Sequence, residues 1–193
     1  MLQITRRLSL LALASLVAVA LSGPAAAKDQ FLGSDDAKEK DEPQEFLKDY
    51  DKLTKGAEAD WVYFTGSPKE FKKVVLKPFE STGKGSRARM AAEEGQEYLE
   101  QWIERSKKLG WEVVKSGGDL TIEGNVFNAW EPSGAARFWG GWYANPGCGL
   151  ELMAKDSKGN VVFQIRHKAK GSTISDAVEN GLENIVETIE KGK

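Results

Sequence analysis

The feature that most constrains the fold is a run of predicted strands in the second half of the chain. Residues 120–130 alternate as a strand with one buried face requires, with apolar side chains at Leu120, Ile122, Val126 and Trp130. Residues 137–143, 150–155 and 161–168 are three further predicted strands, and the turn-forming residues 156–160 join the last two. The pattern predicts a run of antiparallel strands.

Two amphipathic helices flank this run. The first ends at Gly110, and its apolar face consists of Ala91, Tyr98, Leu99, Trp102, Ile103 and Leu109. The second covers about residues 175–191, and its apolar face consists of Val178, Leu182, Ile185, Val186 and Ile189. Asp176 in its first turn is stabilised by the helix dipole.

Shorter elements complete the prediction. Residues 60–64, 73–79 and 111–114 are expected to be extended, and residues 44–53 to form a short amphipathic helix or turn. The fold class predicted is therefore α+β: a mostly antiparallel sheet of about five strands with two main helices packed on one face.

The first residues have the pattern of a secretory signal peptide. Arg6 and Arg7 precede an apolar run over residues 8–21, and three alanines end at Ala27, after which we expect cleavage. A membrane anchor is disfavoured because the run of about 14 residues is shorter than the roughly 20 that a bilayer span needs. Pro24 stands where a lipoprotein would carry its acylated cysteine. We therefore expect a periplasmic protein without a lipid anchor.

The expected organisation is a signal peptide over residues 1–27, a flexible tether over 28–43 and a single α+β domain over 44–193. After cleavage, 25 basic and 29 acidic residues remain, a net charge of −4. This acidic balance argues against a nucleic-acid partner, and no transmembrane helix is expected in the mature chain. The sole cysteine, Cys148, excludes an intramolecular disulfide.

No residue pattern predicts an active site. Cys148 and His167 could form a nucleophile and base only if the fold brought them together, and a small buried residue or a surface thiol is the expected role of Cys148. One histidine and one cysteine cannot supply a tetrahedral metal site. Residues 83–86 resemble a phosphate-binding loop in composition only. We therefore expect a protein that is not an enzyme and has no metal or cofactor.

The most unusual segment is residues 134–149, which is rich in glycine. Glycine within strands marks a bulge, a bend or a close approach of another group. In one interpretation the segment is a twisted hairpin whose aromatic side chains cover the sheet. In the other it is an exposed platform for a partner, and the candidate contact residues are then Phe138, Trp139, Trp142 and Tyr143.

Several segments carry a resemblance to known families. Residues 46–53 and 72–79 are similar to the opening of bacterial envelope lipoproteins that are classed as domains of unknown function. Residues 119–124, 133–141 and 156–159 resemble a second family of that kind, in which a strand ends in glycine and an Asp-x-x-Gly hairpin follows. The resemblance implies a periplasm-facing domain with a fold similar to the N-terminal domain of TolB, and it implies no activity.

Two functions remain open from the sequence. The first is a non-enzymatic periplasmic binding or assembly module of the cell envelope, whose partner is an envelope protein, a lipid or a glycan. The alternative is an oligomeric outer-membrane or secretion-associated component that uses the Gly-rich aromatic hairpin for subunit or lipid contact.

Overall fold

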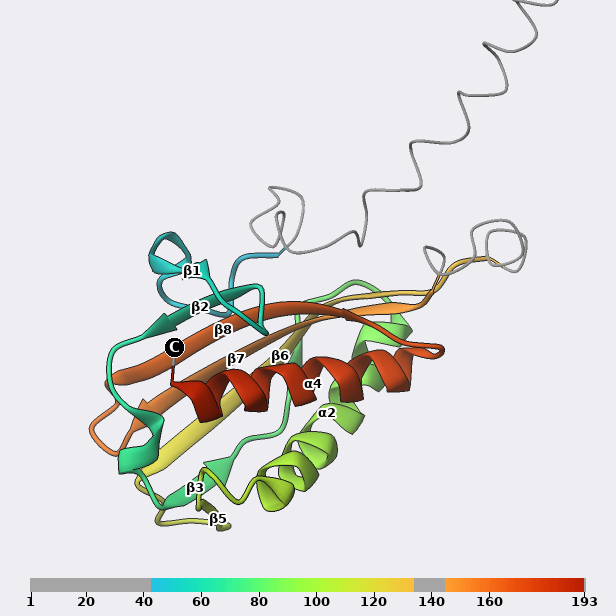
Figure 1. Ribbon diagram of the computed structural model, residues 1–193. Coiled ribbons are helices and arrows are strands. Elements are labelled where there is room, and N and C mark those ends of the chain that lie inside the picture. Colours follow the sequence, from blue (N-terminus) through green and yellow to red (C-terminus); the bar gives the residue numbers. More distant parts are fainter. Residues whose placement is uncertain (1–42, 134–144, 193) are drawn as a thin grey trace, which may run out of the picture. The chain divides into compact units, whose positions relative to one another are not determined.

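The computed structural model describes residues 43–133 and 145–192, which form a mixed sheet with two long helices packed on one of its faces (Figure 1). The predicted signal peptide, most of the predicted tether and the predicted strand 137–143 lie outside these residues. Within the described ranges, no helix is long and apolar enough to cross a bilayer.

The sheet has eight strands, in the order β1-β2-β8-β7-β6-β3-β5, and β4 pairs with β6. Their bounds are β1 Thr54–Lys55, β2 Trp61–Phe64, β3 Lys73–Leu76, β4 Glu80–Ser81, β5 Glu112–Val113, β6 Leu120–Trp130, β7 Gly147–Asp156 and β8 Val161–Lys170. The sheet is therefore larger than the expected mostly antiparallel sheet of about five strands, and it is mixed, while the α+β class is confirmed.

The sheet is mixed because a helix separates β3 from β6. Strands β1, β2, β8, β7 and β6 pair antiparallel in that order, but β6 pairs parallel with β3 and β4, and β3 pairs parallel with β5. Parallel neighbours need a crossover connection, which α2 (Ser86–Arg105) supplies between β3 and β6. Three strands, β1, β4 and β5, have only two residues each. Of these, β1 and β4 were not predicted, because strands this short have no periodic pattern.

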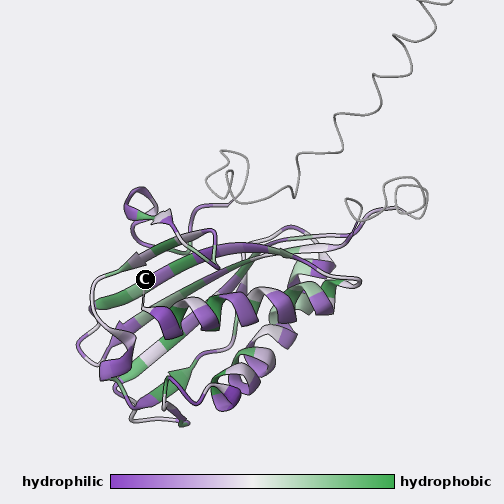
Figure 2. Ribbon diagram, in the orientation of Figure 1, coloured by the Kyte–Doolittle hydropathy of each residue, from purple (hydrophilic) through white to green (hydrophobic). Residues whose placement is uncertain are grey.

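The two helices bury their apolar faces against the same side of the sheet. Helix α4 (Ile174–Lys191) begins with a capping box between Thr173 and Asp176 and ends at Gly192, whose φ of 66° suits a left-handed cap. Figure 2 shows hydrophilic and hydrophobic residues alternating along both helices, as expected for elements with one buried face. Helix α2 ends at Arg105, earlier than the predicted Gly110, although Leu109 is still buried.

A β-bulge in β6 changes which side chains face the helices. The register with β7 shifts between Val126 and Asn128, so Phe127 is an extra residue. Beyond the bulge Ala129, which pairs with Cys148, packs against the main core. The predicted even spacing therefore holds as far as Val126, and Trp130 does not share its face.

Strand β6 and helix α2 are held together by the ring of Phe79. A Cβ atom added at Gly124 of β6 would lie 2.3 Å from Phe79 Cε1, and one added at Gly95 of α2 would lie 2.6 Å from Phe79 Cδ2. Both glycines therefore leave the space that the ring fills. This contact sets how closely α2 approaches the centre of the sheet.

We predict that Gly124→Ala lowers the free energy of unfolding by about 1–3 kcal/mol, because the new methyl group overlaps the ring of Phe79. Chemical denaturation measures the change. Gly66→Ala is the control: its Cβ would lie 4.0 Å from the nearest heavy atom, on Val162, so a change within about 0.5 kcal/mol is expected. Equal effects of the two substitutions would contradict the assignment.

Candidate functional site

The candidate contact residues Phe138, Trp139, Trp142 and Tyr143 lie outside the described residues. They belong to the connection between β6 and β7, whose described ends are Ser133 and Asn145. The described residues near this connection belong to the paired strands β6 and β7, to one face of the sheet and to a pocket at the end of β6.

The strands that carry this connection are paired to its base. Trp130 pairs with Gly147, Ala129 with Cys148, and Gly147 in turn with Lys170 of β8. The amide of Gly171 donates a hydrogen bond of 3.1 Å to the carbonyl of Pro146. The two strands that the connection joins are thus hydrogen-bonded to each other, and β7 also to β8, close to the described ends of the connection.

The structure explains why one position of the Gly-rich segment, residue 149, is a glycine. A Cβ atom at Gly149 would lie 2.4 Å from Cζ of Phe127, the bulge residue on the neighbouring strand. The guanidinium carbon of Arg166 lies 3.5 Å from the centre of the same ring. Gly149 therefore marks a close approach, as glycine in a strand predicts, and the approaching group is a side chain of this chain.

Below this ring lies a fully buried ion pair between Arg166 and Glu151, which are cross-strand neighbours on β8 and β7. Both side chains have no solvent exposure. Glu151 also accepts hydrogen bonds of 2.8 Å from the Tyr50 hydroxyl and from the Asn125 amide. Burial raises the pKa of the Glu151 carboxyl, and the charge of Arg166 opposes this effect.

The ion pair is covered by an N-terminal strap, residues 43–53, on the sheet face opposite the helices. Arg166 donates to the carbonyl of Pro43 at 3.1 Å, and the amide of Lys48 donates to Gln164 Oε1 at 2.6 Å. Leu47 and Leu53 pack on Met153 of β7 in a small second cluster. Of the two predicted alternatives for this segment, a helix or a turn, the structure shows the turn. Only Tyr50–Lys52 are helical, and they form a single 3₁₀ turn.

Sequence reasoning placed residues 44–53 in the domain as a helix or turn, but it missed their contact with the sheet and the ion pair that they cover. Glu151 and Arg166 each lie within a predicted strand, and a charged residue there is ordinarily assigned to solvent. A signal was available for Glu151, whose neighbours over residues 148–154 are all apolar or glycine, since a strand buried on both faces has that composition. Arg166 had no such signal, because β8 also contains Gln164 and His167.

The structure does not bring Cys148 and His167 together as a catalytic pair. His167 Nδ1 lies 3.1 Å from Asp60 Oδ2, and its Nε2 lies 3.1 Å from the amide nitrogen of Asn184 on α4. With both ring nitrogens held, the imidazole joins β8 to α4 and to the segment before β2. Cys148 is fully buried, and burial raises the pKa of its thiol.

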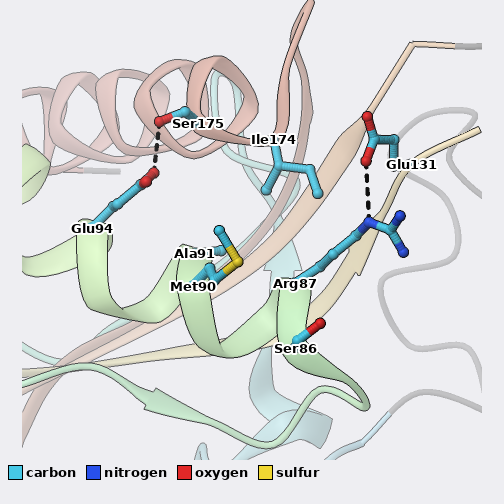
Figure 3. Close-up of a pocket in the computed structure, with 8 residues that line it drawn as sticks. All are labelled: Ser86, Arg87, Met90, Ala91, Glu94, Glu131, Ile174 and Ser175. Atoms are coloured by element: carbon cyan, nitrogen blue, oxygen red, sulfur yellow. Dashed lines mark hydrogen bonds and ion pairs between the residues drawn. The ribbon is translucent and has the colours of Figure 1, made fainter.

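A pocket of about 420 Å³ lies where the N-terminal ends of α2 and α4 meet the end of β6 (Figure 3). Its apolar part consists of Met90, Ala91 and Ile174, and Figure 3 shows Met90 and Ile174 pointing toward one another. Its rim is polar: Arg87 bonds Glu131 at 3.1 Å, and Ser175 donates to Glu94 at 2.6 Å. Glu131 is the residue that follows β6, so the pocket adjoins the base of the 134–144 connection.

The described residues show no site for a metal. Over 43–133 and 145–192, no three histidine, cysteine, aspartate or glutamate side chains gather closely enough to hold an ion. The arrangement around the connection instead offers apolar contact, hydrogen-bond acceptors and one guanidinium, which are the means of binding another molecule.

Comparison with known proteins identifies the fold. No family model and no curated protein matches the chain. Among solved structures, the chain is similar to the PelC dodecamer from Paraburkholderia phytofirmans, with a TM-score of 0.50 and 14% identity over 66% of this chain and 96% of that one. A single-residue variant of that PelC has a TM-score of 0.47 and 15% identity over 67% and 95%. At such identity the likeness shows an α+β subunit fold that a PelC subunit shares. The TolB-like fold remains a prediction.

We predict that Arg166→Met lowers the free energy of unfolding by about 3–5 kcal/mol, because it leaves the Glu151 carboxylate buried without its counter-ion. The double variant Arg166→Met/Glu151→Gln removes both charges and is expected to be more stable than Arg166→Met alone. Urea denaturation measures both. Lys155→Met, which breaks a partly exposed ion pair with Glu123, is the control and should lower the free energy of unfolding by less than about 1 kcal/mol.

We predict that the protein loses stability at alkaline pH, because the hydroxyl of Tyr50 has a raised pKa in the folded state. Burial, aided by the charge of Glu151, raises the pKa of Tyr50 from 10.0 to about 12. Below pH 10 both states keep this proton and stability is full. As the pH rises from about 10 towards about 12, only the unfolded chain loses the proton, so the free energy of unfolding falls.

The measurement is the urea midpoint between about pH 8 and about pH 12. Tyr50→Phe should show a shallower decline than the wild type. Parallel curves for wild type and Tyr50→Phe would show that the hydroxyl of Tyr50 does not keep its proton.

Proposed function

We propose that the protein is an exported, non-enzymatic subunit of an oligomeric cell-envelope component, whose subunits meet through the Gly-rich aromatic segment 134–144. The observation that carries the proposal is the fold. The chain superposes on 96% of a PelC subunit, and that PelC is a dodecamer. The signal-peptide pattern of the first 27 residues supports export to the envelope.

The aromatic segment supports an assembly role on chemical grounds. Phe138, Trp139, Trp142 and Tyr143 are the residue types that supply most of the binding energy in protein interfaces. The connection that holds them follows β6 and precedes β7, two strands fixed by the buried Arg166–Glu151 pair and by Phe127. A rigid base under a binding segment reduces the entropy that binding costs.

The second candidate is a monomeric periplasmic module that docks an envelope protein, a lipid or a glycan with the same aromatic residues. The pocket beside the base of the connection favours this candidate, because a concave surface with an apolar floor and a polar rim suits a partner side chain or a small ligand. The two candidates differ in the mass of the native particle.

We predict that the protein recovered from the periplasmic or membrane fraction has a native mass of several subunits, measured by light scattering after size exclusion. Trp139→Ala and Trp142→Ala should each lower this mass toward that of one subunit while leaving the melting temperature nearly unchanged, because they remove contact area between subunits. A large fall in melting temperature would place them in the core.

Trp111→Ala is the control for this experiment. Trp111 is buried, and its indole donates to the carbonyl of Pro68 at 3.1 Å. Its loss should lower the melting temperature strongly, which shows what removal of a core tryptophan does in this fold. A wild-type protein that is monomeric at every concentration would contradict the oligomeric proposal and favour the second candidate.

A further inference from the structure

We infer that the pocket between the N-terminal ends of α2 and α4 is the acceptor for the aromatic segment 134–144 of a second copy of this chain. The inference rests on the proposed oligomer and names the surface to which its contact segment binds. The pocket is lined in part by Met90, the most exposed large hydrophobic side chain of the described residues, at 59%.

The floor of the pocket suits a large apolar side chain. Met90 and Ala91 lie in the second turn of α2, and Ile174 is the first residue of α4. Methionine adapts its shape and makes favourable contacts between sulfur and aromatic rings. The volume of about 420 Å³ lies in the range of about 300–1,000 Å³ that binding pockets occupy.

The rim suits an aromatic side chain that also donates a hydrogen bond. Carboxylates of Glu94 and Glu131 can accept from an indole N–H or a phenol O–H, and the guanidinium of Arg87 can stack on a ring. These groups are accessible to a partner, since the side chains of Arg87 and Glu131 are 56% and 36% exposed. Tryptophan and tyrosine combine an apolar body with such a donor.

The charges of the two surfaces are complementary. Glu94 and Glu131 outnumber Arg87 on the rim, so the pocket carries one net negative charge. The segment 134–144 has a single charged residue, Arg137, so it carries one positive charge beside its four aromatic residues. Opposite charges at the edge of an interface set its orientation and speed association.

A second copy is the occupant because the segment and the pocket are two different parts of one chain with opposite net charges, and the pocket includes Glu131, which directly follows β6. The Arg87–Glu131 ion pair stands at the point where the chain leaves β6, between that exit and the apolar floor (Figure 3). A contact between two unlike surfaces of identical subunits is heterologous, and it repeats from subunit to subunit until a ring closes. Such a contact produces assemblies larger than a dimer.

The test uses single-cysteine chains in a Cys148→Ser background. A tagged chain carrying Met90→Cys is co-expressed with an untagged chain carrying Trp139→Cys, and disulfides are formed by mild oxidation. The expected result is a cross-linked dimer of one tagged and one untagged chain. Glu104→Cys, exposed on the same helix about 21 Å from residue 90, replaces Met90→Cys as the control and should yield little of this dimer.

A second measurement needs no cross-link. Met90→Lys places a positive charge opposite Arg137, and it should raise the concentration at which the assembly dissociates about tenfold or more without lowering the melting temperature. An assembly of wild-type mass that gives no Met90–Trp139 cross-link, and that Met90→Lys leaves unchanged, would overturn the inference and leave the proposed function standing.

Two further outcomes separate the remaining possibilities. A disulfide that forms only when both cysteines are placed in one chain, with the mass of a single subunit, would show that the segment occupies its own pocket and would overturn the inference. A wild-type protein that stays monomeric would instead refute the proposed oligomer, and this inference with it.

Discussion

The buried ion pair between Arg166 and Glu151 determines how the sheet face opposite the helices is organised. Two charges without solvent exposure are tolerated only if hydrogen bonds replace the water that each has lost. The strap supplies the carbonyl of Pro43 and the hydroxyl of Tyr50, and β6 supplies the amide of Asn125. The strap is therefore part of the folded domain, although its composition alone reads as a turn.

The same constraint explains the local irregularities of β6 and β7. The bulge at Phe127 places an aromatic ring over the guanidinium of Arg166, and Gly149 on the next strand leaves the space that this ring needs. A regular strand would keep residue 127 on this face but would turn Ala129 away from the main core, against which it packs. The glycine, the bulge and the ion pair thus form one arrangement, and it holds the three long strands in register up to the base of the 134–144 connection.

Much of this fold could be predicted, because the spacing of apolar residues in a long segment indicates whether it is a helix or a strand. Strand β6 begins and ends where predicted, β7 and β8 are each somewhat longer, and α4 begins one residue early with its predicted apolar face buried. The mixed sheet could not be read from periodicity, since a strand has the same alternation whether its neighbour is parallel or antiparallel. The order strand, helix, strand around α2 was the available sign of a parallel pair.

The candidate site, like the fold, could be predicted only in part. Aromatic residues interleaved with glycine are visible in one stretch of sequence, so Phe138, Trp139, Trp142 and Tyr143 could be named as contact residues, and they stay a prediction. The pocket could not be named, because Arg87 and Ser175 come from helices far apart in sequence and meet only through tertiary packing. Their meeting depends on Phe79, whose ring sets α2 against β6, and on the capping box that begins α4 at Thr173. The elements that stabilise the domain therefore also place an apolar surface beside Glu131, the residue at which the chain leaves β6 towards its aromatic segment.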